Sequence, residues 1–271
     1  MQVSIIITTY NAENFIVSTL NSVASQTYKN YEVILIDDGS TDNTKEIIKN
    51  FIKKYDHNNK FKLFCEKHIG RANSLNLGIK KANYDWIAIL DADDLWNKYK
   101  LEIQLKYLKE LNLNFLSTKS ITFTSDGEVN TSNRPSIRKN GLFTEITMDK
   151  LLRRSLINHS SVVFRKELAK YDTSRSSQID LELWLRLLEE GIKMYRLNIE
   201  LVYKRFHNDQ HFERNNRKRY IFNSYKLKMQ YAIRNRKFSS AFFLFLKIPY
   251  YFIPPKYAYM ILNFFNSTER Y

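Results

Sequence analysis

The stretch Val3-Ser-Ile-Ile-Ile-Thr-Thr-Tyr-Asn11 is a run of β-branched residues that turns polar at its end. A short, continuous apolar run of this kind is typical of a buried β-strand. After it, Ile16, Leu20 and Val23 recur at helical spacing, which predicts an amphipathic helix. The chain therefore opens with a strand and a helix, the unit from which parallel sheets are built.

The same unit recurs over the next seventy residues. Apolar runs predict further strands at residues 33–36, 61–65 and 86–90, and helical spacing at residues 47–52 and 72–79 separates them. Strands that alternate with helices predict an α/β fold, with a Rossmann-like, mainly parallel sheet covered by helices on both faces.

Beyond residue 95 the alternation is less regular, and no low-complexity linker interrupts it. The spacing predicts a helix at 101–108, strand and polar loop at 112–135, a strand at 160–164, a helix at 181–188 and an extended segment at 194–203. We expect residues 1–210 to form one domain, with a nucleotide-binding half at 1–110 and an acceptor half at 111–210.

Three of the predicted strands run directly into polar residues, at Thr8-Thr9-Tyr10-Asn11, Asp37-Asp38-Gly39-Ser40 and Asp91-Ala92-Asp93-Asp94. Ligands of parallel α/β sheets bind beyond these carboxyl ends. Five carboxylates gathered there repel one another unless a cation or a donor-rich ligand compensates. Alternate carboxylates in the last segment suit Mg²⁺ or Mn²⁺, which commonly hold diphosphates. The alternative is that these acidic residues only cap the helices that follow.

Four motifs in this order carry a resemblance: the stretch 3–11, Asp37-Asp38-Gly-Ser-Thr-Asp42, Gly70-Arg-Ala-x-Ser-x-Asn-x-Gly78 and Asp91-x-Asp-Asp94. Together they resemble the signature of GT-A fold, family 2 inverting glycosyltransferases of the bacterial surface-polysaccharide type, over roughly residues 1–210. The resemblance implies a nucleotide-sugar donor, Mn²⁺ or Mg²⁺ as cofactor, and transfer with inversion at the anomeric carbon.

Matching positions in those motifs imply a donor site. Thr8, Tyr10 and Asp38 should bind the nucleoside, with Asp38 accepting from the base and Tyr10 stacking near it. Arg71 should lie near the base or the diphosphate, since its charge would stabilise the leaving group. Asp91 should lie near the ribose and the sugar. Asp93 should be the metal ligand.

Inversion requires a general base on the acceptor side. The family places an aspartate at the start of a helix, before a Trp-Leu-Arg segment, and Asp180 matches it in Ile179-Asp180-Leu-Glu182-Leu-Trp184-Leu-Arg186. Ile179 stands where the family usually has glutamate. Glu182 is the rival base, but residues two apart on a helix point to different faces. We predict Asp180; its alternative is a helix-start residue favoured by the helix dipole.

Two further segments match the family more loosely. His159, in Asn158-His159-Ser160-Ser161, resembles the lining of the acceptor cleft. Arg205 and His207 resemble a late Arg-x-His element near the diphosphate. The alternative for each histidine is a residue with no more than a structural role.

The chain of 271 residues has a formal net charge of +15, and its basic excess is concentrated near the end. The first 110 residues carry 15 basic and 14 acidic side chains, whereas residues 201–271 carry 14 and 3. We expect residues 211–271 to form a basic, aromatic, helical extension that contacts an anionic membrane surface. Its alternatives are packing on the catalytic domain or on a second subunit in a homo-oligomer. A nucleic-acid-binding protein is the competing function for such charge.

The single cysteine, Cys65, lies in an apolar run, which predicts a buried thiol and a reducing compartment. The first residues show no signal peptide. We therefore expect a cytoplasmic glycosyltransferase of hexosyltransferase type, peripheral at the inner face of the plasma membrane. It would transfer sugar from a nucleotide donor, most simply UDP-linked, to a hydroxyl of a polyprenyl-diphosphate-linked or cell-surface glycan, such as O-antigen or capsule. A dinucleotide-dependent oxidoreductase is disfavoured because no G-x-G-x-x-G follows the first strand.

Overall fold

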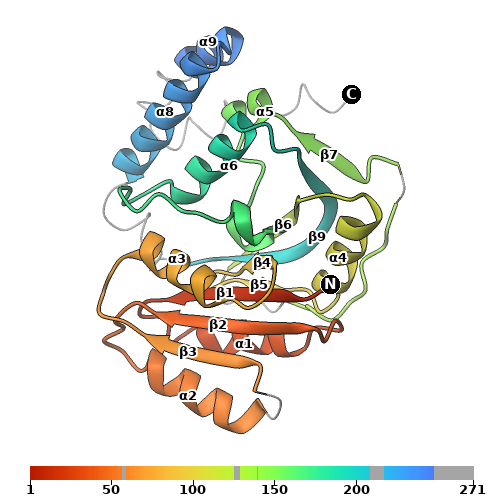
Figure 1. Cartoon of the computed structure of the whole chain (residues 1–271), viewed down its shortest axis with the longest axis vertical. Helices are drawn as coiled ribbons and strands as arrows, with labels where there is room; N and C mark the ends of the chain where they lie inside the picture. Colours follow the sequence, from red (N-terminus) through yellow and green to blue (C-terminus); the bar gives the residue numbers. More distant parts are fainter. Residues whose placement is uncertain (57–58, 125–128, 139, 208–216, 247–271) are drawn as a thin grey trace.

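One mixed β-sheet runs through the part of the chain that the computed structural model describes, residues 1–56, 59–124, 129–138, 140–207 and 217–246 (Figure 1). Its strands there follow the order β3-β2-β1-β4-β8-β6-β9-β5, and β7 pairs with β9. Their bounds are β1 (Val3–Thr9), β2 (Tyr31–Asp37), β3 (Phe61–Cys65), β4 (Trp86–Ile89), β5 (Leu95–Trp96), β6 (Phe115–Thr124), β7 (Phe143–Ile146), β8 (Val163–Arg165) and β9 (Met194–Phe206).

The first four strands are parallel to one another, and β6 and β9 form a further parallel pair. β1 pairs in parallel with both β2 and β4, and β2 pairs in parallel with β3. In this register Thr9 lies opposite Asp37, so the polar ends of the two strands meet at one edge. β8 then joins β4 and β6 in antiparallel fashion and extends the sheet into the acceptor half. The predicted α/β architecture with a mainly parallel sheet is confirmed.

Helices cover both faces of the sheet because alternate strand residues point to opposite sides. Ile5 and Ile7 pack with α1 (Ile16–Ala24), α2 (Thr44–Tyr55) and α4 (Lys100–Glu110). Ile6 points to the other face and packs in a second core with the remaining helices of the described part of the chain. Those helices are α3 (Arg71–Lys81), α5 (Met148–Arg153), α6 (Ile179–Glu189), α8 (Arg217–Arg234) and α9 (Phe238–Leu246).

Close packing of α3 on the sheet requires glycine at position 78. A Cβ atom added to Gly78 would lie 2.6 Å from Cγ2 of Ile6, which is well inside van der Waals contact. The glycine of the Gly70–Gly78 motif therefore lets α3 lie directly on β1. As a result its first residue, Arg71, stands beside the carboxyl ends of the strands.

Two local predictions were wrong. Residues 160–161 belong to a 3₁₀ turn, η1 (His159–Ser161), and not to a strand, because the Asn158 side chain accepts a hydrogen bond from the Ser160 N–H at 2.8 Å. The thiol of Cys65 is exposed and not buried, since Cys65 ends β3 and β3 is the outermost strand on its side of the sheet.

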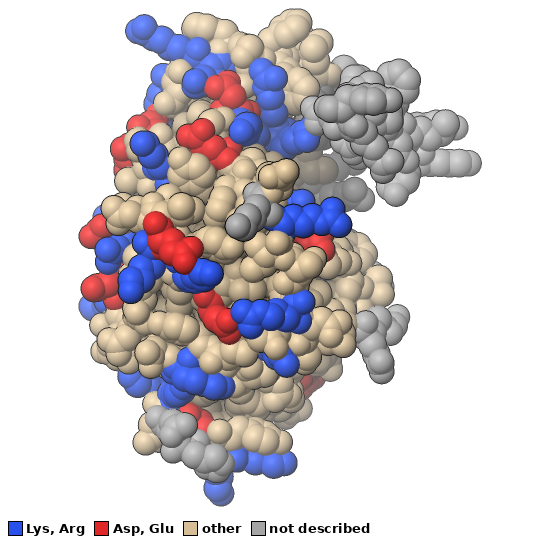
Figure 2. Space-filling view, turned by 90° about the vertical axis from the view of Figure 1, so that its right-hand side faces the viewer, with Lys and Arg blue, Asp and Glu red and all other residues tan. Residues whose placement is uncertain are grey.

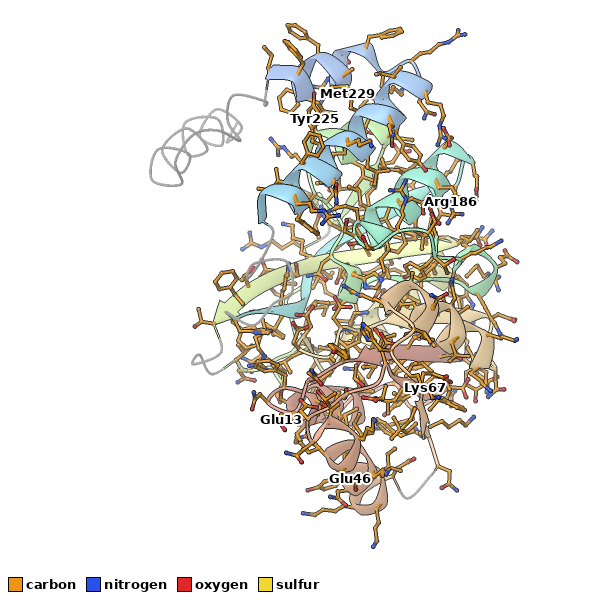
Figure 3. All side chains as sticks on the ribbon, turned by 90° about the vertical axis from the view of Figure 1, so that its left-hand side faces the viewer. Glu13, Glu46, Lys67, Arg186, Tyr225 and Met229 are labelled. Carbon is orange, nitrogen blue, oxygen red and sulfur yellow. The ribbon has the colours of Figure 1, made fainter. Side chains whose placement is uncertain are left out.

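The two C-terminal helices of the described residues pack onto the acceptor half. Leu227, Tyr231 and Ala232 of α8 and Leu244 of α9 are buried in the same core as α5 and α6. Tyr225 and Met229 lie along α8, above Arg186 of α6 in the view of Figure 3, and both are partly buried against that core.

Much of the predicted aromatic segment, residues 247–271, lies outside the described residues. Among the helices that are described, none has the length and apolar character that crossing a bilayer requires.

Candidate active site

The ends of β1 and β2 place two of the predicted nucleoside ligands at the edge of the sheet. Thr8 is half-buried near the end of β1. Tyr10, which follows the strand, is 49% exposed, and its ring centroid lies 4.5 Å from that of His68. The two ring planes are inclined at 38° to each other, and together they present an aromatic surface beside the strand end. His68 carried no family signal, and only the fold brings it to Tyr10.

The adjacent carboxylates Asp37 and Asp38 have different surroundings. Asp37 is fully buried, and its carboxylate accepts hydrogen bonds from Thr9 Oγ1 at 3.2 Å and from the Ser40 N–H at 3.0 Å. Asp38 accepts from the backbone N–H groups of Ile69 at 2.7 Å and Gly70 at 3.1 Å. Asp37 therefore stabilises the turn after β2, whereas Asp38 joins that turn to the start of α3.

The predicted residues Arg71, Asp91 and His159 form one cluster. Nη2 of Arg71 lies 2.6 Å from Oδ1 of Asp91, and Nδ1 of His159 lies 3.0 Å from the same oxygen. Burial alone would raise the pKa of Asp91, but the charge of Arg71 and the hydrogen bonds from His159 and Arg71 hold it below its usual value. Asp91 in turn raises the pKa of Arg71. Asp91 is thus held ionised beside a fixed guanidinium.

The last two carboxylates of the acidic loop also differ in their roles. Asp94 is buried and accepts from Ser160 Oγ at 2.6 Å and from the Arg205 N–H at 3.0 Å. Burial and the charges of Asp93 and Asp91 raise the pKa of Asp94 well above its usual value. Asp93 is partly exposed, and its Oδ2 lies 3.1 Å from Nε2 of His207.

Arg205 is buried and engaged with the acidic loop. Its Nε donates to the Asp93 carbonyl at 2.9 Å, and its Nη2 donates to Ser18 Oγ of α1 at 3.0 Å. The guanidinium therefore ties β9 to the loop that follows β4. Through Arg205 the loop that carries Asp93 is also linked to α1.

Asp93 and His207 have the chemistry of a metal-binding pair. A carboxylate oxygen and an imidazole nitrogen at 3.1 Å suit a divalent ion such as Mn²⁺, with further oxygens from a diphosphate and water. Within the described ranges no group of three or more His, Cys, Asp or Glu side chains could hold a metal on its own.

Asp180 is the second residue of α6, and its charge acts on residues of the Arg71–Asp91 cluster. Burial and the charge of Asp180 raise the pKa of Tyr171 well above its usual value, and Asp180 also contributes to the raised pKa of Arg71. Within the described ranges no hydrogen-bond donor reaches the Asp180 carboxylate. The Asp180 side chain is partly exposed.

The rival carboxylate, Glu182, points into the interface between α6 and α8. Its Oε1 lies 3.1 Å from Nε of Arg186 and 3.3 Å from the Tyr231 hydroxyl, and the side chain is buried. Glu182 thus faces another element than Asp180 does, as the helical spacing predicts.

Sequence reasoning missed three residues of this site. Asp94 is part of the motif at residues 91–94, but the sequence did not predict that its side chain is buried. Tyr171, whose hydroxyl lies 2.8 Å from Nε2 of His159, has no local signal because the contact arises from tertiary packing. His68 is the third, because its contact with Tyr10 also arises from tertiary packing.

Two comparisons of sequence give consistent results. Residues 4–171 match the sequence profile described as Glycosyl transferase family 2. The Escherichia coli protein UDP-Glc:alpha-D-GlcNAc-diphosphoundecaprenol beta-1,3-glucosyltransferase WfaP is 32% identical over 212 residues, which cover 76% of this chain and 77% of WfaP. An uncharacterized glycosyltransferase of Rickettsia bellii is 45% identical over 108 residues, and the match spans only 15% of that relative's length.

Solved structures share the fold. The S. aureus protein TarS 1-349 in complex with UDP-GlcNAc gives a TM-score of 0.66 at 20% identity, covering 86% of this chain and 66% of TarS 1-349. The mannosyltransferase PcManGT of Pyrobaculum calidifontis, in complex with GDP-Man and Mn²⁺, gives 0.61 at 19% identity, covering 87% of this chain and 64% of PcManGT. These relatives and structures give no support to the nucleic-acid-binding alternative.

Proposed function

The chain belongs to glycosyl transferase family 2 and has the GT-A fold, and from this we propose that it is a metal-dependent, inverting hexosyltransferase. It moves a sugar from a UDP-sugar to a hydroxyl of a polyprenyl-diphosphate-linked glycan. The observation that carries this proposal is the placement of Asp180. Its carboxylate is close enough to Arg71 and Tyr171 to raise the pKa of both, and it accepts no hydrogen bond from the described residues.

The donor lies along the carboxyl ends of β1, β2 and β4. Tyr10 stacks near the base, Asp38 accepts from it, and Thr8 lines the same edge. Arg71 faces the diphosphate, and Asp91 accepts from the ribose or the sugar. A UDP-linked donor agrees with the ligand of TarS and with the printed activity of WfaP.

Asp93 and His207 would hold the cation. Mn²⁺ or Mg²⁺ bound there supplies positive charge that offsets the charge developing on the leaving diphosphate. Arg71 adds a fixed positive charge to the same region, since Asp91 keeps it ionised and in place. Arg205 holds the backbone of the acidic loop and so keeps Asp93 at the site.

Asp180 takes the proton of the acceptor hydroxyl as that oxygen bonds to the anomeric carbon. The bond from the anomeric carbon to the diphosphate breaks on the opposite side, and UDP leaves with its electron pair. Configuration at the anomeric carbon is therefore inverted. The proton on Asp180 passes to solvent after the glycan product leaves.

The acceptor class proposed here is supported by the relative at 32% identity. WfaP is named for transfer to α-D-GlcNAc-diphosphoundecaprenol. With a lipid-linked acceptor of this class, the enzyme would act at the cytoplasmic face of the plasma membrane. The surface for that membrane is the exposed side of α9, defined by Phe238, Phe242, Phe245 and Leu246, together with basic side chains of α8.

A transfer assay tests this function. The full chain is incubated with each of several nucleotide sugars, Mn²⁺ and a synthetic GlcNAc-diphosphate-lipid, and the product is examined by mass spectrometry. We expect transfer from a UDP-sugar and its loss with a chelator. Absence of both transfer and nucleotide-sugar binding with every donor would contradict the proposal.

A further inference from the structure

A closed ring of contacts joins Tyr171 to the Arg71–Asp91 pair. The Tyr171 side chain is buried, and its hydroxyl lies 2.8 Å from Nε2 of His159. On the other edge of the imidazole, Nδ1 lies 3.0 Å from Oδ1 of Asp91 and 3.0 Å from Nη2 of Arg71. The backbone of Tyr171 exchanges two hydrogen bonds with Asn76 of α3, at 2.8 and 2.9 Å. One helix therefore carries Arg71 and also anchors Tyr171.

Hydrogen-bond directions in this ring select one imidazole tautomer. In the described part of the chain, Nε2 of His159 is the acceptor within reach of the Tyr171 hydroxyl. A buried hydroxyl hydrogen without an acceptor is costly, so the hydroxyl donates to Nε2. The imidazole proton is then on Nδ1 and is directed to Oδ1 of Asp91. Nη2 of Arg71, 3.0 Å from Nδ1, can only donate, and it donates to the same oxygen at 2.6 Å.

The two oxygens of Asp91 consequently have different roles. Oδ1 accepts from both Arg71 Nη2 and His159 Nδ1. No donor among the described residues reaches Oδ2, and the side chain is partly exposed. Oδ2 is thus the oxygen that remains for a ligand hydroxyl.

We propose that Tyr171 is a positioning residue which, through His159, fixes Asp91 so that Oδ2 accepts a hydroxyl of the bound nucleotide sugar. This inference rests on the proposed function, because it assumes that Asp91 contacts the donor. It adds to that function a residue of the acceptor half that sets the geometry of the donor site.

The tautomer is tested first, without ligand. The full chain is labelled with nitrogen-15 histidine, and the signals of His159 are assigned by their loss in His159→Gln. We expect a proton on Nδ1 in the native chain and a loss of this preference in Tyr171→Phe. The matched control is Tyr31→Phe, which removes the buried hydroxyl that donates to the Val23 carbonyl at 3.1 Å, at the far edge of the sheet. An unchanged tautomer in Tyr171→Phe would overturn the proposal.

Donor affinity is tested next, by calorimetry with UDP-glucose and Mn²⁺. Tyr171→Phe should weaken binding about tenfold, whereas Tyr31→Phe should leave it unchanged. In the His159→Gln background the Tyr171→Phe change should add no further loss, because Tyr171 acts through the imidazole. Equal affinity in the native chain and Tyr171→Phe, or fully additive losses, would contradict the inference.

The two experiments separate this inference from the proposed function. If the native chain binds no nucleotide sugar at all, the proposed function fails, and the tautomer result still shows whether Tyr171 orients His159. If the native chain binds donor and only the effect of Tyr171 is missing, the inference alone fails.

Discussion

Carboxylates that are neighbours in the sequence of this chain have different surroundings in the fold. Asp93 is partly exposed beside His207, whereas Asp94 is buried under Ser160 and the backbone of Arg205. Asp180 acts electrostatically on Arg71, and Glu182, two residues later, pairs with Arg186. At the scale of the residue, the direction in which a side chain points decides its role.

Asp180→Asn should abolish transfer while donor binding is kept. The amide cannot take the proton of the acceptor hydroxyl, so we expect a loss of kcat of about 10²- to 10⁴-fold. A transfer assay and calorimetry with UDP-glucose measure the two effects separately. Asp172→Asn, in the loop before α6, is the matched control and should keep its activity. Near-native turnover in Asp180→Asn would reject Asp180 as the base.

Lys100, the first residue of α4, is a buried lysine. Its Nζ donates to Oε1 of Gln104 at 2.8 Å and lies 4.0 Å from the centre of the Trp96 ring. Burial lowers the pKa of Lys100 well below its usual value. The unfolded chain therefore binds this proton more tightly than the folded chain does.

The free energy of unfolding should consequently rise with pH while the unfolded lysine is still protonated, up to about pH 10.4. The gain is at most about 1.4 kcal/mol per pH unit for one proton. Denaturant melts of the native chain and Lys100→Met at several alkaline pH values measure it. The variant should lack this part of the pH dependence. Parallel curves for the two proteins would show that Lys100 stays protonated in the fold.

At the scale of the element, α8 is held by contacts that its own sequence does not predict. Arg234 donates to Glu189 of α6 at 2.7 Å, Asn223 to Ser177 at 3.1 Å, and Gln178 to the Tyr220 carbonyl at 3.4 Å. These contacts place the start of α8 beside the loop that leads into Asp180. We infer that α8 supports the acceptor half and is more than an appendage.

Leu227→Ala should therefore destabilise the whole domain. Leu227 is 2% exposed, and removing a buried leucine side chain costs about 2–5 kcal/mol. Chemical denaturation measures the change. Phe222→Ala on the same helix is the matched control, because Phe222 is 63% exposed and should have little effect. Equal stability of both variants would mean that α8 is not part of the cooperative unit.

For the whole molecule, the net charge of +15 conceals an uneven distribution. On the face seen in Figure 2, Lys and Arg side chains alternate with Asp and Glu along the body of the molecule. The exposed apolar side chains of α9 differ from this pattern, since Phe238, Phe242 and Phe245 lie along one short helix. Apolar side chains next to basic ones suit an anionic bilayer surface.

The double change Phe242→Ser and Phe245→Ser should reduce membrane binding about tenfold, because it removes apolar area that the bilayer would bury. Sedimentation with phosphatidylglycerol-containing vesicles measures the bound fraction. The matched control changes two exposed residues elsewhere, Leu111→Ser and Ile137→Ser, and should bind as the native chain does. Equal sedimentation of both double variants would exclude α9 as the membrane contact.

The amino-acid sequence by itself determined the succession of strands and helices in the first hundred residues and the polar ends of three strands. Both are local properties, since periodicity and strand-end residues are read within a few positions. It also marked Asp38, Arg71, Asp91 and Asp93, because the motifs that carry them are contiguous.

Only the tertiary structure decided which side chains meet. His159 lies 68 residues from Asp91, and Arg205 lies 111 residues from Asp94, yet each pair shares a hydrogen bond. Tyr171 has no signal of its own and gains its role from the pairing of η1, α3 and the loop before α6. Such contacts depend on how the two halves pack, and packing is fixed by burial summed over many residues. The residue types of the site can therefore be read from short motifs, whereas the contacts between them depend on the packing of the whole domain.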